Sequence, residues 1–320
     1  PFMKKQKLHE PVAGGACILC HEPHSSWLPE LLVAEGNELC IPCHEETIQM
    51  DRQARHVHPP LDDDCVQCHD PHSSDLPAQI LDEPRKLCVG CHGEIERLIA
   101  ASPIVHSPVN DGQQCENCHY GHSSMLPKLL KKSALDTCLT CHDREITLKD
   151  GRKTEDMVAL LKENPNHHGP IRQADCSACH DPHASSHFSL LRQTYPELFY
   201  APFNPDNYKL CFGCHREELV SSKNGVGVTQ FREGELNLHH VHVNREDRGR
   251  TCRACHAVHA SRRYAHMSES VPYGQWQYKL DFTLKANGGS CDSACHKARE
   301  YDRTGTAPVA RPPDDSAPEK

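Results

Sequence analysis

Residues 17–44 read CILCHEPHSSWLPELLVAEGNELCIPCH, and this stretch decides the fold. A Cys-x-x-Cys-His motif opens it at Cys17 and a second one closes it at His44, and a further histidine, His24, follows the first motif by three residues. Two thiols followed at once by an imidazole are the residues that attach a c-type haem, because the thiols bond its vinyl groups and the histidine ligates the iron. The stretch therefore predicts two covalently bound haems.

The same motif accounts for every cysteine of the chain. All 20 cysteines in the 320 residues form ten pairs, each followed directly by a histidine. Nine pairs have the spacing C-x-x-C-H, whereas the tenth, Cys291-Asp-Ser-Ala-Cys295-His296, has one extra residue that we expect to loop out. We predict ten haem c groups, with thioether bonds to Cys17, Cys20, Cys40, Cys43, Cys65, Cys68, Cys88, Cys91, Cys115, Cys118, Cys138, Cys141, Cys176, Cys179, Cys211, Cys214, Cys252, Cys255, Cys291 and Cys295. The predicted proximal iron ligands are His21, His44, His69, His92, His119, His142, His180, His215, His256 and His296.

Zinc binding and disulfide bonding are the alternative interpretations of paired cysteines. The first two pairs are 19 residues apart, which a zinc ribbon also allows, and secreted chains often use cysteines for disulfides. Neither alternative explains the histidines. Since 26 of 320 residues are histidine, one would follow a given cysteine by chance about 8% of the time, yet one follows all ten pairs. For the stretched pair Cys291/Cys295, a disulfide stays the alternative.

The composition is poor in material for an ordinary core. Only 37% of the residues are hydrophobic and 5% are aromatic, and 24 are proline. Ten porphyrins would supply the missing apolar surface, whose burial drives compaction. We therefore expect the chain to fold around its haems.

Charge and targeting features narrow the functional classes. The net charge of −9 argues against nucleic acid as a partner, because phosphate binding needs positive charge. No stretch has the roughly 20 apolar residues of a transmembrane helix. The first residues also show no charged-then-apolar leader, so we expect a secretion signal to have been removed. Haem is attached outside the cytoplasmic membrane, which predicts an extracellular or cell-surface location, with the periplasm as the alternative.

Each iron needs a second axial ligand, and an iron whose sixth position is filled only passes electrons. The chain has 16 histidines outside the motifs. Five follow the odd-numbered motifs by three residues, in phrases such as Glu22-Pro-His-Ser-Ser26, and five more lie 7 to 10 residues before those motifs. The predicted distal ligands are His24, His72, His122, His183, His259, His9, His58, His106, His168 and His242.

Other ligands compete with these ten histidines. Six histidines are left over, and four of them lie next to predicted upstream ligands; the six are His56, His167, His187, His239, His240 and His266. Methionine is the other common ligand, but the five methionines recur at no fixed position. We therefore predict bis-histidine coordination with low reduction potentials, and leave open which histidine serves which iron.

Repeats organise the chain. Residues 1–150 hold three tight dihaem repeats, 151–303 hold two repeats expanded by insertions at 193–208 and 262–287, and 304–320 form a Pro-rich tail predicted to be disordered. Apolar spacing predicts helices over 91–101 and 154–163. The predicted fold class is mostly coil with short α-helices and little or no β structure, in an elongated multihaem array organised by haem packing.

The pattern Cys-x-x-Cys-His-x-Pro-His-Ser/Ala-Ser, followed by a second motif, resembles the doubled-CxxCH multihaem c-type cytochromes. The resemblance runs from about His9 to His296, and the stretched tenth motif departs from it. It implies a chain of alternating stacked and perpendicular haem pairs, close enough for electron tunnelling. Members of this family include periplasmic decahaem proteins that feed outer-membrane porin conduits and extracellular cytochromes that form conductive filaments.

These observations favour an electron-transfer protein over an enzyme. A multihaem reductase of nitrite, hydroxylamine or tetrathionate type needs an open iron, often marked by lysine in place of the motif histidine, and no motif here has one. We expect a subunit of an extracellular cytochrome filament that forms head-to-tail polymers with other copies of itself, an end histidine such as His9 ligating a haem across the joint. The alternative is a periplasmic or porin-associated shuttle. Its partners would be redox proteins or extracellular acceptors.

Overall fold

The computed structural model describes residues 2–148, 150–293 and 296–305. The chain forms two compact units, which are treated separately below. Unit 1 contains Pro1–Cys138 and Pro182–Ala184, and unit 2 contains Leu139–Asp181 and Ser185–Lys320. Most of the tail predicted to be disordered, residues 306–320, lies outside the described residues.

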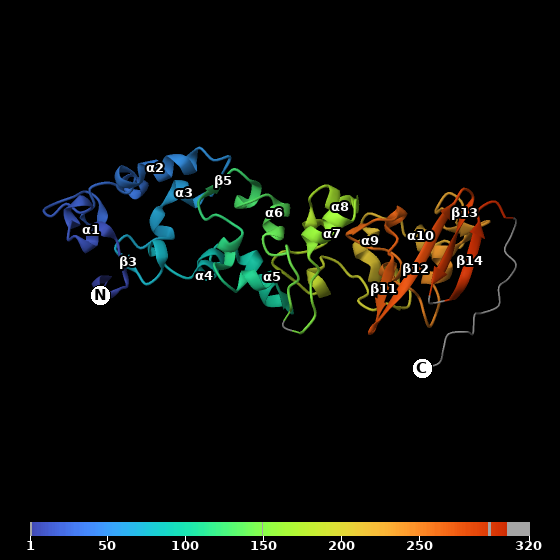
Figure 1. Cartoon of the computed structure of the whole chain (residues 1–320). Coiled ribbons are helices and arrows are strands. Elements are labelled where there is room, and N and C mark those ends of the chain that lie inside the picture. Colours follow the sequence, from blue (N-terminus) through green and yellow to red (C-terminus); the bar gives the residue numbers. More distant parts are fainter. Residues whose placement is uncertain (1, 149, 294–295, 306–320) are drawn as a thin grey trace. The chain divides into compact units, whose positions relative to one another are not determined.

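Unit 1 consists of short helices joined by turns and very short strands (Figure 1). Its helices are α1 Glu10–Ala13, α2 Ile41–Arg52, α3 Pro60–Asp63, α4 Pro84–Val89, α5 Gly93–Ala101 and α6 Ala134–Leu139, the last ending at the unit boundary. Its strands are β1 Lys7–Leu8, β2 His56–Val57, β3 Ser73–Ser74, β4 Ile104–Val105 and β5 Ser123–Ser124. The helix predicted over 91–101 is confirmed as α5.

Unit 2 has short helices of the same kind and a larger share of strand. Its helices are α7 Met157–Glu163, α8 Gly169–Arg172, α9 Lys209–Phe212, α10 Glu218–Ser221 and α11 Leu238–Val243. Its strands are β6 Asn166–His167, β7 Ala184–Ser185 (which begins in unit 1), β8 Arg232–Glu233, β9 Leu236–Asn237, β10 Ala260–Ser261, β11 Ser270–Tyr273, β12 Trp276–Lys285, β13 Gly288–Ser293 and β14 His296–Asp302. The predicted helix at 154–163 is present as α7, where the Asp156 side chain accepts the N–H of Ala159 and so caps it.

Most Cys-x-x-Cys-His motifs form one turn of helix. In eight of them the histidine N–H donates to the carbonyl of the first cysteine, at 2.8–3.1 Å. Odd-numbered motifs begin in 3₁₀ turns, at Cys17–Leu19, Cys65–Gln67, Gln114–Asn117, Cys176–Ala178 and Cys252–Ala254. A single turn places the first thiol and the imidazole on the same side of the backbone, because residues four apart share a helix face.

A left-handed turn follows each odd-numbered motif. Each is a 3₁₀ segment, and the five are Pro29–Leu31, Pro77–Gln79, Pro127–Leu129, Phe188–Leu190 and Tyr264–His266. The last two residues of each have positive φ, between 51° and 58°. This conformation turns the backbone so that the final carbonyl accepts the N–H of the residue after the motif histidine, at 2.6–2.8 Å. Further 3₁₀ turns lie at Phe2–Lys4, Gly36–Leu39, Ser107–Val109 and Pro205–Tyr208.

Adjacent repeats are joined by two-residue antiparallel ladders. In unit 1, β1 pairs with β3 and β2 with β5, and in unit 2 β6 pairs with β10. In each ladder the strand just before one repeat's upstream histidine meets the Ser-Ser or Ala-Ser pair of the next repeat. These small residues are buried, with Ser73 2% and Ser261 4% exposed. The ladders therefore set the register between repeats.

The insertion at 193–208 builds a small aromatic core in unit 2. Tyr208 is 1% exposed and lies against Tyr195, with ring centroids 5.7 Å apart. Phe203 and Phe212 pack beside Tyr208 at 5.7 and 5.9 Å. This cluster supplies apolar contacts that the tight repeats lack, since their described residues contain few buried side chains.

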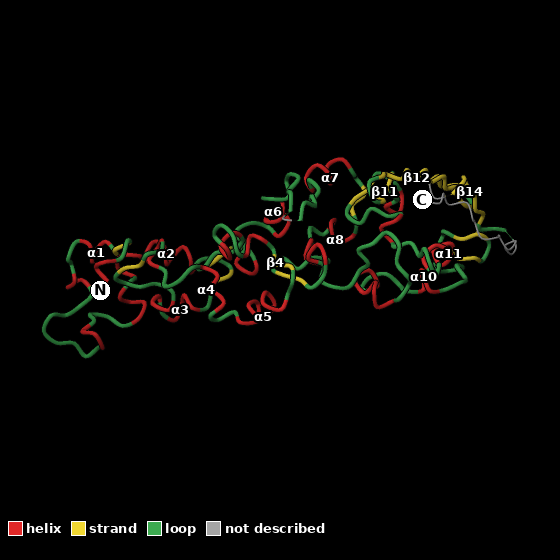
Figure 2. The backbone as a smooth tube through the Cα atoms, turned by 90° about the horizontal axis from the view of Figure 1, so that it is seen from below, coloured by secondary structure: helices red, strands yellow, loops and turns green. Residues whose placement is uncertain are grey.

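The end of unit 2 is a four-stranded antiparallel sheet, in the order β11-β12-β13-β14. Its longest strand, β12, alternates apolar and polar residues from Trp276 to Lys285, and Leu280 on the apolar side is 4% exposed. One face of the sheet therefore packs inward and the other faces solvent. The strands stand out in Figure 2 as the longest yellow segments. This sheet is a correction to the expectation of little or no β structure.

Candidate haem sites

Imidazole rings lie in pairs throughout both units, each pair joining a motif histidine to a histidine from outside the motifs. In unit 1 the ring centroids are 5.9–6.3 Å apart in the pairs His21–His72, His44–His9, His69–His122, His92–His58 and His119–His183. In unit 2 they are 6.0–6.5 Å apart in the pairs His180–His259, His215–His168, His256–His239 and His296–His242. Nine of the ten predicted proximal ligands thus face a second imidazole.

This separation fits a single iron held between two imidazoles. An iron–nitrogen bond of about 2 Å on each side, and about 1.1 Å from nitrogen to ring centre, put two centroids about 6 Å apart. Among residues 2–148, 150–293 and 296–305, no three His, Cys, Asp or Glu side chains are grouped as a metal-binding cluster. The paired imidazoles therefore fit an iron whose four remaining ligands come from a porphyrin. When bound, a haem supplies a one-electron couple at each pair.

The first four odd-numbered motifs have an imidazole of the following repeat opposite their motif histidine. His72 lies opposite His21, His122 opposite His69, and His183 opposite His119 in unit 1, and His259 lies opposite His180 in unit 2. Each of these histidines is thus displaced by one repeat from the motif that it follows in sequence. The ladder between the repeats brings it into place, because its carbonyl accepts an N–H from the preceding repeat's upstream histidine, as at His9 N–His72 O, 3.0 Å.

Four even-numbered motifs have the upstream histidine of their own repeat opposite their motif histidine. His9 lies opposite His44 and His58 opposite His92, with ring planes 17° and 14° apart. In unit 2, His168 lies opposite His215 and His242 opposite His296. The remaining upstream histidine, His106, belongs to unit 1, and the remaining even-motif histidine, His142, belongs to unit 2.

The structure brings one histidine into the site that the sequence analysis placed among the spares. His239 lies opposite His256 of the ninth motif at 6.3 Å. It sits on α11 three residues before His242, so both imidazoles share one face of that helix. The buried Asn237 side chain accepts the N–H of His239 and caps the helix start. The spacing of three residues was the signal that could have identified it.

His24 is the predicted ligand that the described residues leave without an imidazole opposite it. Its side chain is 90% exposed, and the Glu22 carboxylate lies 3.9 Å from its Nδ1. Two histidines outside the predicted ligands form hydrogen bonds to backbone carbonyls. His167 Nε2 and His240 Nδ1 bond to the carbonyls of Leu161 and Val220.

Backbone carbonyls at Nδ1 fix the tautomer of many of these imidazoles. In each odd-numbered motif, Nδ1 of the motif histidine bonds to the carbonyl of the residue nine positions further along the chain. The distance is 2.7 Å from His21 to Glu30 O and 2.9 Å from His256 to Ala265 O. These carbonyls belong to the left-handed turns. Donation from Nδ1–H to a carbonyl leaves Nε2 free as the metal-binding atom.

Upstream histidines are oriented in the same way across the repeat junctions. His9 Nδ1 bonds to Pro71 O at 2.9 Å, His58 Nδ1 to Gly121 O at 2.8 Å, and His106 Nδ1 to Pro182 O at 2.8 Å. Each acceptor directly precedes a post-motif histidine. The junction therefore orients two predicted distal ligands with one set of backbone contacts.

Burial keeps several of these imidazoles neutral, which is the form that ligates metal. Burial lowers the pKa of His239 to about 3 and that of His242 to about 4. Burial likewise lowers the pKa values of His180 and His256 below their usual range.

Cys295, the second cysteine of the tenth motif, lies outside the described residues. Thiols of successive motifs meet. Cys88 and Cys115 share a hydrogen bond that raises the pKa of Cys88, and Cys211 and Cys252 share one that raises the pKa of Cys211. Each pair consists of the first cysteines of an even motif and of the next odd motif.

The tenth motif has a different local structure from the others. Cys291 lies on β13 and His296 on β14, and β13 ends at Ser293, which pairs with His296. An extra residue suits this arrangement, because the motif follows a strand pair rather than one helical turn. Cys291 also pairs with Phe282 of β12 and so shares its face of the sheet.

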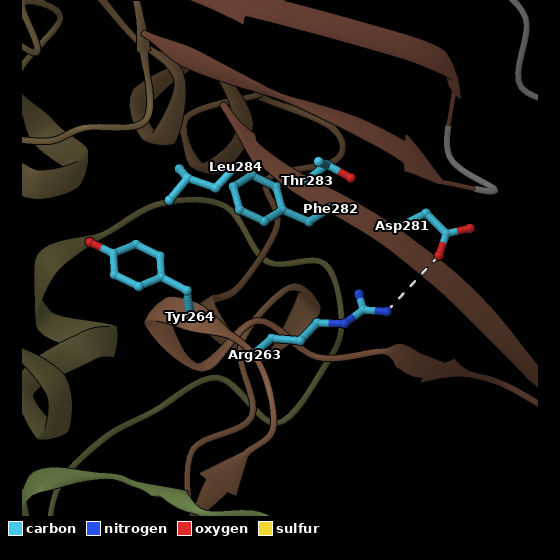
Figure 3. Close-up of a pocket in the computed structure, with 6 residues that line it drawn as sticks. All are labelled: Arg263, Tyr264, Asp281, Phe282, Thr283 and Leu284. Carbon is cyan, nitrogen blue, oxygen red and sulfur yellow. Dashed lines mark ion pairs between the residues drawn. The ribbon is translucent and has the colours of Figure 1, made fainter. Parts of the chain in front are cut away.

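A pocket of about 400 Å³ lies along β12 beside the turn that follows the ninth motif. Figure 3 shows Tyr264, Phe282 and Leu284 on one side of it and the ion pair of Arg263 with Asp281, 4.0 Å, on the other. Phe282, which lines the pocket, pairs with Cys291 on the neighbouring strand β13. The pocket therefore borders the surroundings of the tenth motif and adds no separate cluster of chemically reactive groups.

Comparison with known families identifies the class. The doubled CXXCH motif family matches four segments, residues 9–49, 58–97, 106–147 and 168–219, which together cover more than half of the chain. Each match begins at one of the upstream histidines, His9, His58, His106 or His168. The chain belongs to the doubled CXXCH motif family, and it is a multihaem c-type cytochrome that transfers electrons.

A search of curated proteins found no match to the chain. In the part of the chain that the structure describes, none of the helices has both the length and the apolar character required to cross a bilayer.

Proposed function

We propose that this cytochrome conducts electrons along ten bis-histidine haems and carries out no catalysis of its own. The observation that supports the proposal most strongly is the second imidazole opposite nine of the ten motif histidines. A filled sixth position leaves no site for a substrate on the iron. In sequence, His106 is the upstream histidine of the repeat that contains His142, as His9 is for His44. The sequence thus offers a candidate second ligand for each of the ten irons.

The contacts between thiols of successive motifs support electron transfer from haem to haem. Because each cysteine bonds the edge of one porphyrin, the neighbouring thiols of Cys88 and Cys115 would hold two porphyrin edges together. The thiols of Cys211 and Cys252 would do the same in unit 2. Electron transfer between such haems requires no movement of the chain.

Spectroscopy and mass spectrometry test this function. The holoprotein should have the mass of ten haems added to the chain, and its ferric electron paramagnetic resonance spectrum should contain low-spin signals only. Carbon monoxide should leave the reduced spectrum unchanged. A high-spin signal, or carbon monoxide binding, would favour the multihaem reductase alternative, because either result requires an open iron.

The place of action and the assembly are further parts of the proposal. Covalent haem attachment outside the cytoplasmic membrane supports an extracellular or cell-surface site, with the periplasm as the alternative. Head-to-tail assembly into a filament accounts for electron transfer over long distances, and a soluble or porin-associated shuttle is the competing role. Electron microscopy of the purified holoprotein separates them, since discrete particles alone would contradict the filament.

A further inference from the structure

Arg250, in the segment between α11 and the ninth motif, has a buried charged group that the polypeptide leaves unpaired. Its Nη1 atom is buried and has no hydrogen-bond partner among the residues that the structure describes. The guanidinium lies over the ring of Tyr200, 5.9 Å from the ring centroid, which is within the range of a cation–π contact. This contact covers one face of the guanidinium but accepts none of its N–H bonds. Because an unpaired buried charge is costly, the position favours an anion.

The backbone holds this side chain in a fixed place. The Arg250 N–H donates to the carbonyl of His242 at 3.0 Å, and Arg250 forms an antiparallel bridge with Tyr200. A Cβ at Gly249 would lie 2.5 Å from the carbonyl oxygen of Val243, so this close approach requires glycine. The guanidinium is therefore positioned by packed backbone on both sides of it.

The same backbone bond places Arg250 beside an imidazole pair. His242, which accepts the Arg250 N–H, faces His296 with the ring centroids 6.5 Å apart. Burial lowers the pKa of His242 to about 4; a hydrogen bond to the Leu238 carbonyl opposes this shift, and the positive charge of Arg250 adds to it. The cation therefore lies near the iron position that His242 and His296 define.

The propionates of the haem at this position are anions of the right chemistry. A haem c carries its propionate carboxylates on the porphyrin edge opposite its thioether bonds, and the planar fork of a guanidinium suits a carboxylate. The ninth haem matches less well, because Cys252 attaches its thioether edge only two residues after Arg250. A dissolved anion would have to enter a position that is closed to solvent. The carboxylate of the tenth haem is therefore the best partner.

We propose that Arg250 pairs with a propionate of the haem held between His242 and His296. Nη1–H donates to a carboxylate oxygen, while Tyr200 covers the face of the guanidinium. The pair places a fixed positive charge beside one iron. A nearby cation favours the ferrous state, because reduction adds an electron to the haem. The proposal rests on the ten-haem function above and adds a residue that raises the reduction potential of the tenth haem.

Two substitutions in one segment test the pairing. Arg250→Gln removes the charge, and Arg248→Gln makes the same change at an exposed side chain two residues earlier. Redox titration of the holoprotein should show one component at lower potential in Arg250→Gln and the wild-type curve in Arg248→Gln. Resonance Raman spectra of the reduced holoprotein should show part of the propionate bending band at lower frequency in Arg250→Gln alone, because this frequency falls when a propionate loses a hydrogen bond.

Arg250→Lys extends the test, since lysine keeps the charge without the planar fork. It should carry ten haems by intact mass and shift the potential less than Arg250→Gln does. Loss of one haem from Arg250→Gln, with ten retained in Arg250→Lys, would also support the pairing, because only the lysine variant can still neutralise the propionate.

Other results would overturn the proposal. These are wild-type potentials in Arg250→Gln, a lower potential with an unchanged propionate band, or a mass of nine haems for Arg250→Lys. A wild-type holoprotein with fewer than ten haems, or with a high-spin ferric signal, contradicts the underlying function instead.

Discussion

The carboxylate of Asp51 lies 3.2 Å from Nδ1 of His122, the imidazole opposite His69. Asp51 is on α2 in the first repeat, and its side chain is only 18% exposed. Ser123 donates to its other oxygen at 2.6 Å. The other carboxylates near ligand imidazoles are 3.7–3.9 Å away. His122 therefore has a markedly closer carboxylate than these other histidines have.

Asp51→Asn should raise the reduction potential of the third haem. A buried carboxylate at Nδ1 makes the imidazole a stronger donor, which stabilises ferric iron, and the amide removes that charge. Spectroelectrochemical titration of the holoprotein should show one component shifted upward. The matched control is Glu94→Gln, since Glu94 lies 3.7 Å from His92 with an exposed side chain. Equal titration curves for the two variants would contradict the prediction.

His239→Ala should open one iron. His239 is the imidazole opposite His256, so its loss leaves the ninth haem with five ligands. We expect a new high-spin ferric signal that corresponds to about one haem in ten. His240→Ala serves as the control, because that ring bonds to the carbonyl of Val220 at 3.0 Å instead. A wholly low-spin spectrum of His239→Ala would show that another ligand serves this iron.

Ala78→Gly should stabilise the fold. Ala78 has φ 51° in the left-handed turn whose carbonyl accepts from His69 Nδ1. That conformation costs a residue with a Cβ about 1–2 kcal/mol. Glycine avoids this strain, but its unfolded chain has more conformational freedom to lose, so only part of the strain energy appears as added stability. We expect a net gain of about 0.5–1 kcal/mol. The contrast is Ala100→Gly in α5, which should lose about 1 kcal/mol, and denaturant unfolding of the holoproteins measures both.

Gly289→Ala should disrupt the tenth haem site. A Cβ at Gly289 would lie 2.7 Å from the Tyr301 hydroxyl and 2.8 Å from its ring, closer than real contacts allow. The rings of Tyr301 and Phe231 pack with their centroids 5.2 Å apart. Cys291 lies two residues after Gly289 on the same face of β13. We expect purified protein with nine haems by intact mass.

Gly14→Ala is the control for that substitution, because its Cβ would make ordinary contacts of 3.5 Å and more. It should carry ten haems. If Gly289→Ala also carries ten, the packing of Tyr301 against β13 does not govern haem attachment at Cys291.

The C-terminal sheet shows where sequence interpretation stopped short. Residues 276–285 read WQYKLDFTLK, an unbroken alternation of apolar and polar residues that is typical of a half-buried strand. The expectation of little or no β structure came from the proline content and the haem motifs, which describe the first repeats well. This local alternation is enough to predict the strand β12. The pairing of β12 with β13 and of β13 with β14 required the tertiary structure.

The distal ligands show a different limit. The post-motif and upstream histidines are two groups of predicted ligands, and the structure arranges four members of each group opposite motif histidines. His239 was placed among the spares because one chain segment, 239–242, offers three histidines within four residues. The helix α11 decides among them, since His239 and His242 share a face and His240 turns toward Val220.

The sequence by itself determined the haem attachment points, because thiols and proximal imidazole must lie within one short motif to reach the same porphyrin. It also determined the dihaem repeat, which is written in the chain as a recurring phrase. Only the tertiary structure placed an imidazole of the next repeat opposite the motif histidine in the first four odd-numbered motifs. In the first of them, His72 lies opposite His21, about 50 residues further along the chain, and its position depends on the strand ladder that docks the two repeats.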